Sequence, residues 1–231
     1  MKRVFRFDSS SDQSISYATV KSPVRLPETF TMCSSFKESS ISGSSFFTIY
    51  GEDGGPWLTL SNWVTGNKIT SWLRIRTVWK KVGIIKPYLI NFWIDVCIHV
   101  NTKSGDLSLS FNGEPPLSFK IPELKDQTPQ DLRNNLYLGL SENDEEGPKQ
   151  FHGEVANIQI FEDSDAKHII NMTHCLGAVA EEKLNFETKW TTVGNVEERN
   201  EESWKICNRN KTYRVAIPAK NELARGNKSV Y

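Results

Sequence analysis

The sequence lacks an excess of charge of either sign. Its 28 basic and 28 acidic residues cancel over a chain of 231 residues. A balanced chain has no long-range electrostatic attraction for nucleic acid or for an anionic membrane surface. We therefore expect no nucleic-acid partner, and the charge offers no reason to expect membrane association.

Long apolar segments are also missing. The longest, such as residues 89–94, are far shorter than the roughly 20 residues that span a bilayer. At the N-terminus, residues 1–3 lead directly into Val4 without the apolar core of a signal peptide. A secreted protein would carry its signal peptide outside this sequence, and a cytosolic protein would need none. We expect the first, because of the cysteines and glycosylation sequons described below, and we expect no transmembrane segment.

Motifs of the common enzyme classes are absent. The chain contains no GxSxG, P-loop, GxGxxG or HExxH motif. Its histidines show no shared spacing typical of metal ligands; they are His99, His152, His168 and His174. A carboxylate pair for glycoside hydrolysis is not excluded by sequence alone, although no Glu-x-Asp-x-x-Glu type motif is visible. We predict that the protein is not an enzyme.

No two of the four cysteines form a CxxC pair, which argues against a zinc ribbon or a thioredoxin motif. Cys33 and Cys97 each lie in a segment of alternating residues and point to its less apolar side. Neighbouring strands of one sheet would bring these sulfurs together, and an oxidising compartment would join them. Two free thiols are the alternative. A second disulfide between Cys175 and Cys207 is then left by elimination.

Three N-x-S/T sequons lie toward the end of the chain, at Asn171, Asn210 and Asn227. In secreted proteins such sequons accept N-linked glycans. A single sequon often arises by chance, whereas three near one end support secretion together. We therefore predict a secreted or cell-surface protein.

Alternating apolar and polar residues are abundant. This period of two predicts β-strands. Asn112-Gly113 predicts a type I′ hairpin turn, since both central residues of that turn need positive φ. The expected strands cover residues 4–7, 15–20, 30–36, 46–50, 72–78, 92–101, 107–111, 117–121, 136–140 and 155–161.

Helical signals are few, and only residues 163–174 form a credible helix, with Ser164 as its N-cap. The apolar content of 38%, with seven Trp and twelve Phe, is enough to fill a two-layer core. We predict an all-β fold, a two-sheet antiparallel jelly-roll β-sandwich with one short late α-helix. The sandwich is expected over residues 1–200, followed by a basic C-terminal extension or linker at 201–231.

The order of these motifs resembles the pentraxin family and the laminin-G-like domains of the concanavalin A-like lectins. Residues 27–33 resemble the family's first-cysteine strand. Residues 96–98, with Asn112-Gly113 after them, resemble its second-cysteine strand and hairpin. Residues 136–139 and the acidic loop behind them resemble its calcium-loop region, and residues 151–158 resemble the following strand.

The chain departs from the pentraxin signature around the second cysteine. The family has His, then Cys, Ser or Thr, Trp and Ser, but here Cys97 is surrounded by Asp95, His99, Val100 and Thr102. The resemblance therefore implies a divergent domain. Pentameric assembly does not carry over, and a homo-oligomer is neither implied nor excluded.

The resemblance implies a calcium site in the acidic loop. Calcium takes about six to eight oxygen ligands, and clustered carboxylates repel one another unless a cation neutralises them. The alternative is a solvated acidic loop, which is what such charge runs usually are. The matching metal-ligand positions are Asp53, Glu142, Asn143, Asp144, Glu146 and Gln150.

A basic segment is a second candidate surface. Residues 68–86 hold six basic residues and no acidic residue, and they include Trp72 and Trp79. Such a segment could bind a polyanion such as a heparin-like chain. We favour the simpler interpretation, in which the strands of a half-buried sheet need a polar face.

These observations predict an extracellular recognition module for a phosphate-bearing, carbohydrate or matrix ligand. Calcium would be its cofactor if the acidic loop binds metal. The first alternative is a metal-free adhesion or interaction domain of a longer receptor or lectin. The second, which we favour least, is a concanavalin-like glycosidase.

Overall fold

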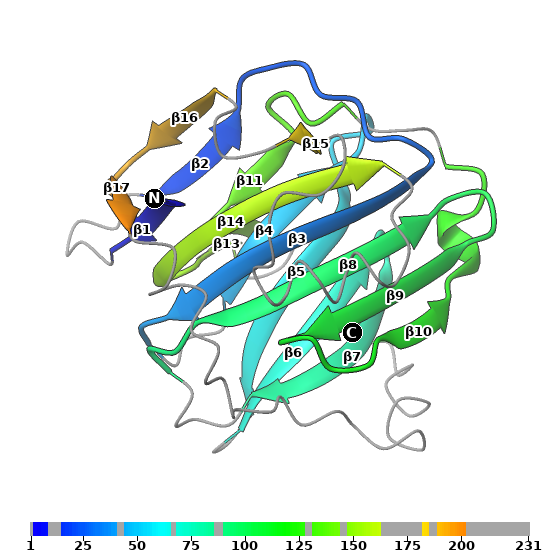
Figure 1. Ribbon diagram of the computed structural model, residues 1–231, viewed down its shortest axis with the longest axis horizontal. Helices are drawn as coiled ribbons and strands as arrows, with labels where there is room; N and C mark the ends of the chain where they lie inside the picture. Colours follow the sequence, from blue (N-terminus) through cyan, green and yellow to red (C-terminus); the bar gives the residue numbers. More distant parts are fainter. Residues whose placement is uncertain are drawn as a thin grey trace.

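The structure is a computed structural model that describes residues 2–8, 15–40, 44–65, 68–85, 90–127, 131–143, 147–162, 182–184 and 189–201. Two antiparallel sheets pack face to face within these residues (Figure 1). The predicted all-β, two-sheet antiparallel jelly-roll sandwich is therefore confirmed. No helix in the described residues is long and apolar enough to cross a membrane.

Sheet A is the layer drawn in front in Figure 1, where β14, β3 and β8 run side by side. Its strand order is β10-β9-β8-β3-β14-β1-β17, and β15 also pairs with β14. The strands are β1 (Lys2–Phe7), β3 (Thr29–Glu38), β8 (Ile94–Asn101), β9 (Asp106–Phe111), β10 (Leu117–Lys120), β14 (Gly153–Glu162), β15 (Glu182–Leu184) and β17 (Val196–Glu201).

Sheet B lies behind sheet A and has the strand order β16-β2-β11-β4-β5-β6-β7. A separate hairpin of β12 (Leu140–Asn143) and β13 (Gly147–Gln150) follows β11, and a short 3-10 turn covers Pro122–Leu124. The strands of sheet B are β2 (Tyr17–Val20), β4 (Ser44–Tyr50), β5 (Pro56–Thr65), β6 (Lys68–Ile75), β7 (Val78–Ile85), β11 (Leu136–Leu138) and β16 (Trp190–Val193).

The core lies between the two sheets and is built from the inward residues of each strand. Phenylalanines dominate its centre, where Phe36 of β3 stacks on Phe46 of β4 with ring centroids 3.8 Å apart. Phe151 packs edge-on against Phe46 at 5.4 Å and against Phe7 at 6.1 Å. Burial of these large rings is the main driving force for joining the layers.

A series of buried, hydrogen-bonded side chains also joins the two layers. The Asn62 amide of β5 donates to the Glu38 carboxylate of β3 at 3.0 Å, and the Ser71 hydroxyl of β6 donates to the Asn62 carbonyl at 2.8 Å. All three residues are buried. Because buried polar groups are stable only when paired, these hydrogen bonds favour one relative placement of the sheets.

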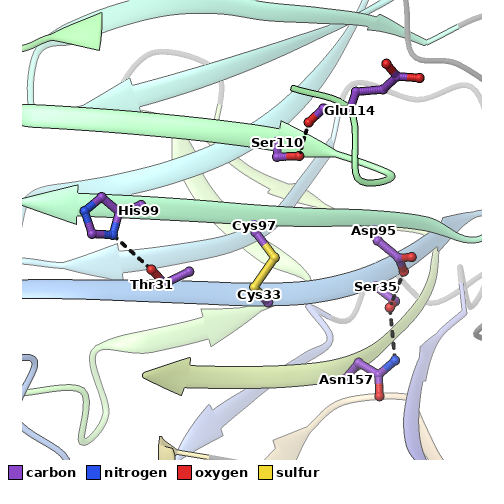
Figure 2. The surroundings of a disulfide bond; sticks show 9 residues. All are labelled: Thr31, Cys33, Ser35, Asp95, Cys97, His99, Ser110, Glu114 and Asn157. Carbon is purple, nitrogen blue, oxygen red and sulfur yellow. Dashed lines mark hydrogen bonds between the residues drawn. A yellow bond between two sulfur atoms is a disulfide. The ribbon is translucent and has the colours of Figure 1, made fainter. Parts of the chain in front are cut away.

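The disulfide between Cys33 and Cys97 is confirmed, with an S–S distance of 2.03 Å (Figure 2). The two cysteines are direct neighbours in the register of β3 and β8. Their sulfurs form a cluster separate from the main core, on the outer side of sheet A. Strand alternation therefore predicted both their pairing and their direction correctly.

The strand predicted over residues 72–78 is interrupted, since residues 72–75 belong to β6 and Val78 begins β7. Arg76, with φ of 51°, and Thr77 form a turn that ends β6 at Ile75 and lets β7 begin at Val78. The inward positions change from odd numbers at Leu73 and Ile75 to an even number at Val82, a shift that the predicted strand overlooked. The predicted turn at Asn112-Gly113 is confirmed, since both residues have positive φ, 49° and 75°.

Several predictions concern residues outside the described ranges. They are the late helix at 163–174, the Cys175–Cys207 disulfide and the sequons at Asn171, Asn210 and Asn227. Strand β17 ends at Glu201, and the proposed extension at 201–231 also falls almost wholly outside them. These stay predictions.

Candidate functional site

The outer face of sheet B carries a continuous row of polar and aromatic side chains. Alternate residues of its strands point away from the core, and the strand registers align one such residue from each strand. From one edge of the sheet to the other, the row reads Thr191, Thr19, Tyr137, Thr48, Thr59, Arg74 and Trp79.

Three threonines of this row are buried, and their hydroxyl groups make no hydrogen bond. Thr48, Thr59 and Thr19 expose 0%, 1% and 8% of their surface. Their Oγ1 atoms have no hydrogen-bond partner. By contrast, the neighbouring Ser45 and Ser61 hydroxyls bond each other at 2.7 Å. Because an unsatisfied buried hydroxyl costs about 1–3 kcal/mol, the threonines are a costly feature in the free protein.

A tyrosine cluster on β2, β11 and β4 adjoins Thr19 and Thr48. Tyr137 stands between Thr19 and Thr48 in the register. Its ring contacts Tyr17 at 5.2 Å and Tyr50 at 5.3 Å between centroids. These rings provide flat apolar surface with polar hydroxyl groups at their ends.

A tryptophan cluster lies over β5, β6 and β7. The Trp63 ring is 5.7 Å from Trp72 and 5.0 Å from Trp79 between centroids. The Arg74 guanidinium lies over Trp79, 5.3 Å from its centroid. Lys81 is the register partner of Trp72. The face thus has an uncharged tyrosine side and a tryptophan side with two cations.

The predicted metal-ligand residues are only partly described. Asp53 is exposed, and its carboxylate accepts hydrogen bonds from Arg76 at 3.0 Å and from the Gly55 backbone N–H at 3.1 Å. Asp53 would therefore have to exchange Arg76 for a cation to serve as a calcium ligand. Gln150 ends β13 and is half-buried.

The remaining predicted ligands belong to the β12–β13 hairpin. Glu142 and Asn143 lie in β12, and only their backbone is described, whereas Asp144 and Glu146 lie outside the described residues. The hairpin contacts β4, the strand that carries Thr48. Gly139 leads into it with φ of 81°, a conformation that favours glycine. The calcium site thus stays a prediction.

The outer face of sheet A also carries polar residues, and they bond to one another (Figure 2). The Ser35 hydroxyl donates to the buried Asp95 carboxylate at 2.6 Å and accepts from Asn157 at 3.2 Å. Thr31 and His99 share a hydrogen bond at 3.0 Å. Because these groups are paired within the protein, they support the disulfide-linked strands and make a weaker case for a ligand site.

Sequence reasoning found only part of the outer face of sheet B. It noted Trp72 and Trp79 in a basic segment, but the partners of these residues come from strands far away in sequence. Alternation within 44–50 and 56–65 could have revealed the polar side of β4 and β5. The residues missed were Tyr17, Thr19, Thr48, Thr59, Trp63 and Tyr137.

The sandwich is a concanavalin A-like lectin fold. Among solved structures, the chain is similar to the native heptameric SAP-like pentraxin of Limulus polyphemus, with a TM-score of 0.70 and 13% identity over 85% of this chain and 94% of that chain. The predicted resemblance to pentraxins is therefore confirmed for the fold. No protein-family profile and no curated protein matches the sequence.

Two further structures share the fold. The full extracellular region of zebrafish Gpr126/Adgrg6 matches with a TM-score of 0.62 and 14% identity, over 88% of this chain and 27% of that chain. A "putative carbohydrate binding protein" of Bacteroides ovatus matches with a TM-score of 0.59 and 16% identity, over 86% of this chain and 60% of that chain. At these identities the likeness shows the fold alone.

Proposed function

We propose that this chain is a carbohydrate-recognition module that binds an oligosaccharide on the outer face of sheet B. The observation that carries the proposal is the pair of aromatic clusters on this face, with Tyr17, Tyr50 and Tyr137 on one side and Trp63, Trp72 and Trp79 on the other. Ligand sites combine apolar and aromatic surface with a few placed polar groups. Sugars match this pattern, because their rings have apolar C–H faces and many hydroxyl groups.

Binding without cleavage fits the composition of this face. Hydrolysis of a glycosidic bond uses a pair of Asp or Glu residues on either side of the bond. The seven strands of sheet B contain neither Asp nor Glu. This supports a binding module over the glycosidase alternative.

Calcium is a second, separable part of the proposal. The β12–β13 hairpin contacts β4, so a cation held by this hairpin would lie near that strand. There it would neutralise the carboxylates and offer coordination positions to a sugar or phosphate oxygen. Calorimetric titration with calcium, and sugar binding with and without EDTA, test this part independently of the aromatic face.

We further propose that the protein acts outside the cell. The Cys33–Cys97 disulfide is typical of oxidising compartments. The similar zebrafish structure is an extracellular region, in which this fold forms part of a longer chain. An adhesion domain that binds a protein would share these features, so sugar binding distinguishes the two functions.

The proposed function is tested by glycan-array screening followed by calorimetry on the best ligand. We expect Trp72→Ala to weaken binding about tenfold or more, because buried tryptophans carry much of the energy of an interface. The matched control is Trp93→Ala, since Trp93 packs against Val4 and Ala156 on sheet A. Absence of any glycan ligand, or equal losses in both variants, would contradict the proposal.

A further inference from the structure

Within the described residues, the strand orders of sheets A and B end in four edge strands. These are β10 and β17 in sheet A, and β7 and β16 in sheet B. An edge strand presents a row of unpaired backbone N–H and C=O groups, so it can pair with a strand of another molecule. Proteins commonly block such pairing with charged side chains on the edge, especially lysine.

Three of these four edge strands carry charged residues. β7 contains Lys80 and Lys81, and β10 ends at Lys120. β17 has the sequence Val-Glu-Glu-Arg-Asn-Glu, with four charged residues. β16 has the sequence Trp-Thr-Thr-Val, with no charged residue and three β-branched residues. Of the four, β16 alone therefore lacks a charge that would block pairing with another strand.

One side of β16 is accessible to a second molecule. Within the described residues β16 pairs with β2 alone. Figure 1 shows β16 and β17 along one outer edge of the sandwich. The Thr192 and Val193 side chains of β16 are exposed to solvent. No other strand of the described chain therefore covers this edge.

Exposed apolar side chains lie beside the same edge. Val193 is the register partner of Tyr17, and the Ile15 carbonyl oxygen lies close to Gly194. Ile15 exposes 43% of its surface and Val193 exposes 41%. They are two of the three large apolar residues that the described part of the chain exposes. Apolar surface next to an edge strand without charges favours association with another strand.

We propose that β16 pairs antiparallel with β16 of a second copy of this chain, so that sheet B continues through both copies. A two-fold axis perpendicular to the sheet would relate the copies, and residues that point to the same face would then lie opposite one another. In a pair centred on Thr192, Thr192 would face the partner's Thr192, and Thr191 would face the partner's Val193. This inference is independent of the proposed sugar binding.

The distribution of charge favours a second copy as the partner. A strand that pairs with its own copy meets its own charges, and like charges directly opposite one another destabilise the pair. Self-pairing of β7 would bring Lys80 and Lys81 of both copies together. β16 brings no charge to the pair, and Lys189 just before it would lie opposite the partner's Asn195. Self-pairing therefore opposes no like charges along β16.

The short length of β16 implies a weak, reversible dimer. The strand has four residues. A pair of this length buries far less than the roughly 1,200–2,000 Å² of a standard stable interface. We expect a dissociation constant on the order of 10–100 µM, so the dimer forms only in concentrated protein.

Sedimentation velocity from about 1 µM to about 1 mM protein tests the inference. We expect the parent protein to change from monomer to dimer over this range. Thr192→Lys and Thr192→Glu should each weaken self-association about tenfold or more, because like charges would then meet at the two-fold axis. The matched control is Ser118→Lys, which adds the same charge to the edge strand β10 and should leave self-association unchanged. Thermal melting confirms that each variant is folded.

A mixture of the two charged variants tests the register of the pair. Equimolar Thr192→Lys and Thr192→Glu proteins should associate again, since opposite charges would face each other across the strand pair. A parent protein that stays monomeric at every concentration overturns the inference. A dimer that survives unchanged in Thr192→Lys, or a mixture that stays as monomeric as either variant alone, overturns it as well.

Discussion

Thr19, Thr48 and Thr59 have buried side-chain oxygens without a hydrogen-bond partner. Natural proteins bond the great majority of their buried polar atoms. Because Thr48 and Thr59 expose only 0% and 1% of their surface, a ligand does not reach these hydroxyls, and they are a cost to the stability of the fold.

The first prediction concerns Thr48→Val, which replaces the hydroxyl with a methyl group of similar shape. Removing the unsatisfied group should raise the free energy of unfolding by about 1 kcal/mol. Thermal melting measures this effect. The control is Ser61→Ala, which breaks the bond to Ser45 and should lower stability. A Thr48→Val protein that is less stable than the parent would contradict the prediction.

The second prediction concerns pH and His152. Burial lowers the pKa of this imidazole below its ordinary value of 6.5, and the Asp8 carboxylate opposes the shift. Protonation therefore costs more in the folded than in the unfolded state. Its contribution to stability is complete above pH 6.5 and is lost as the pH falls through the folded-state pKa.

Melting temperatures from about pH 7.5 to about pH 5 measure this effect. We expect the parent protein to lose more stability over this range than His152→Gln, since the carboxylates of the protein contribute equally to both. If the melting temperatures of the two proteins fell in parallel with pH, His152 would not contribute to the pH dependence of stability.

At the scale of elements, one covalent bond ties β3 to β8. Cys33 and Cys97 are 64 residues apart, and closing a loop of that length restricts the unfolded chain. In the chain-entropy description, such a cross-link contributes about 4 kcal/mol. We predict that the double variant Cys33→Ala/Cys97→Ala unfolds at a clearly lower denaturant concentration. An unchanged midpoint in urea would contradict this role.

The link between β11 and the β12–β13 hairpin depends on Gly139. A Cβ added there would lie 2.7 Å from the Phe7 ring, at a φ of 81° that side chains rarely adopt. We predict that Gly139→Ala lowers stability by about 1–3 kcal/mol from backbone strain, plus the cost of the clash. Gly54→Ala is the control, since Gly54 also has positive φ but nothing within 4 Å. If chemical denaturation showed the same loss of unfolding free energy for both variants, the contact with Phe7 would not be important.

Local patterns predicted most strands but not all of their ends. Alternation in 30–36 and 92–101 predicted β3, β8 and the direction of both sulfurs. It failed at Arg76 and Thr77, where a tight turn shifts the inward positions from Leu73 and Ile75 to Val82 and so changes the phase of the alternation. The β16–β17 hairpin lies in the acidic, polar segment 181–202, where Leu184, Phe186, Trp190 and Val193 predict only a single closing strand. In the structure its strands join both sheets, since β16 pairs with β2 and β17 with β1.

At the scale of the whole molecule, the candidate site exists only after folding. Thr48 and Tyr137 are 89 positions apart, yet they are register partners on one face. Nothing local to either residue indicates the other, so period-two reasoning could predict a polar face but not its members. The fold class could be predicted because it depends on the pattern of many strands, and the site could not because it depends on their order.

The most direct test of sugar binding on sheet B follows the indole N–H groups by NMR during glycan titration. We predict that the signals of Trp63, Trp72 and Trp79, assigned by single replacement with Phe, shift together and saturate, while that of Trp93 stays in place. Shifts at Trp93 with no change in the three indoles of sheet B would contradict the proposed site.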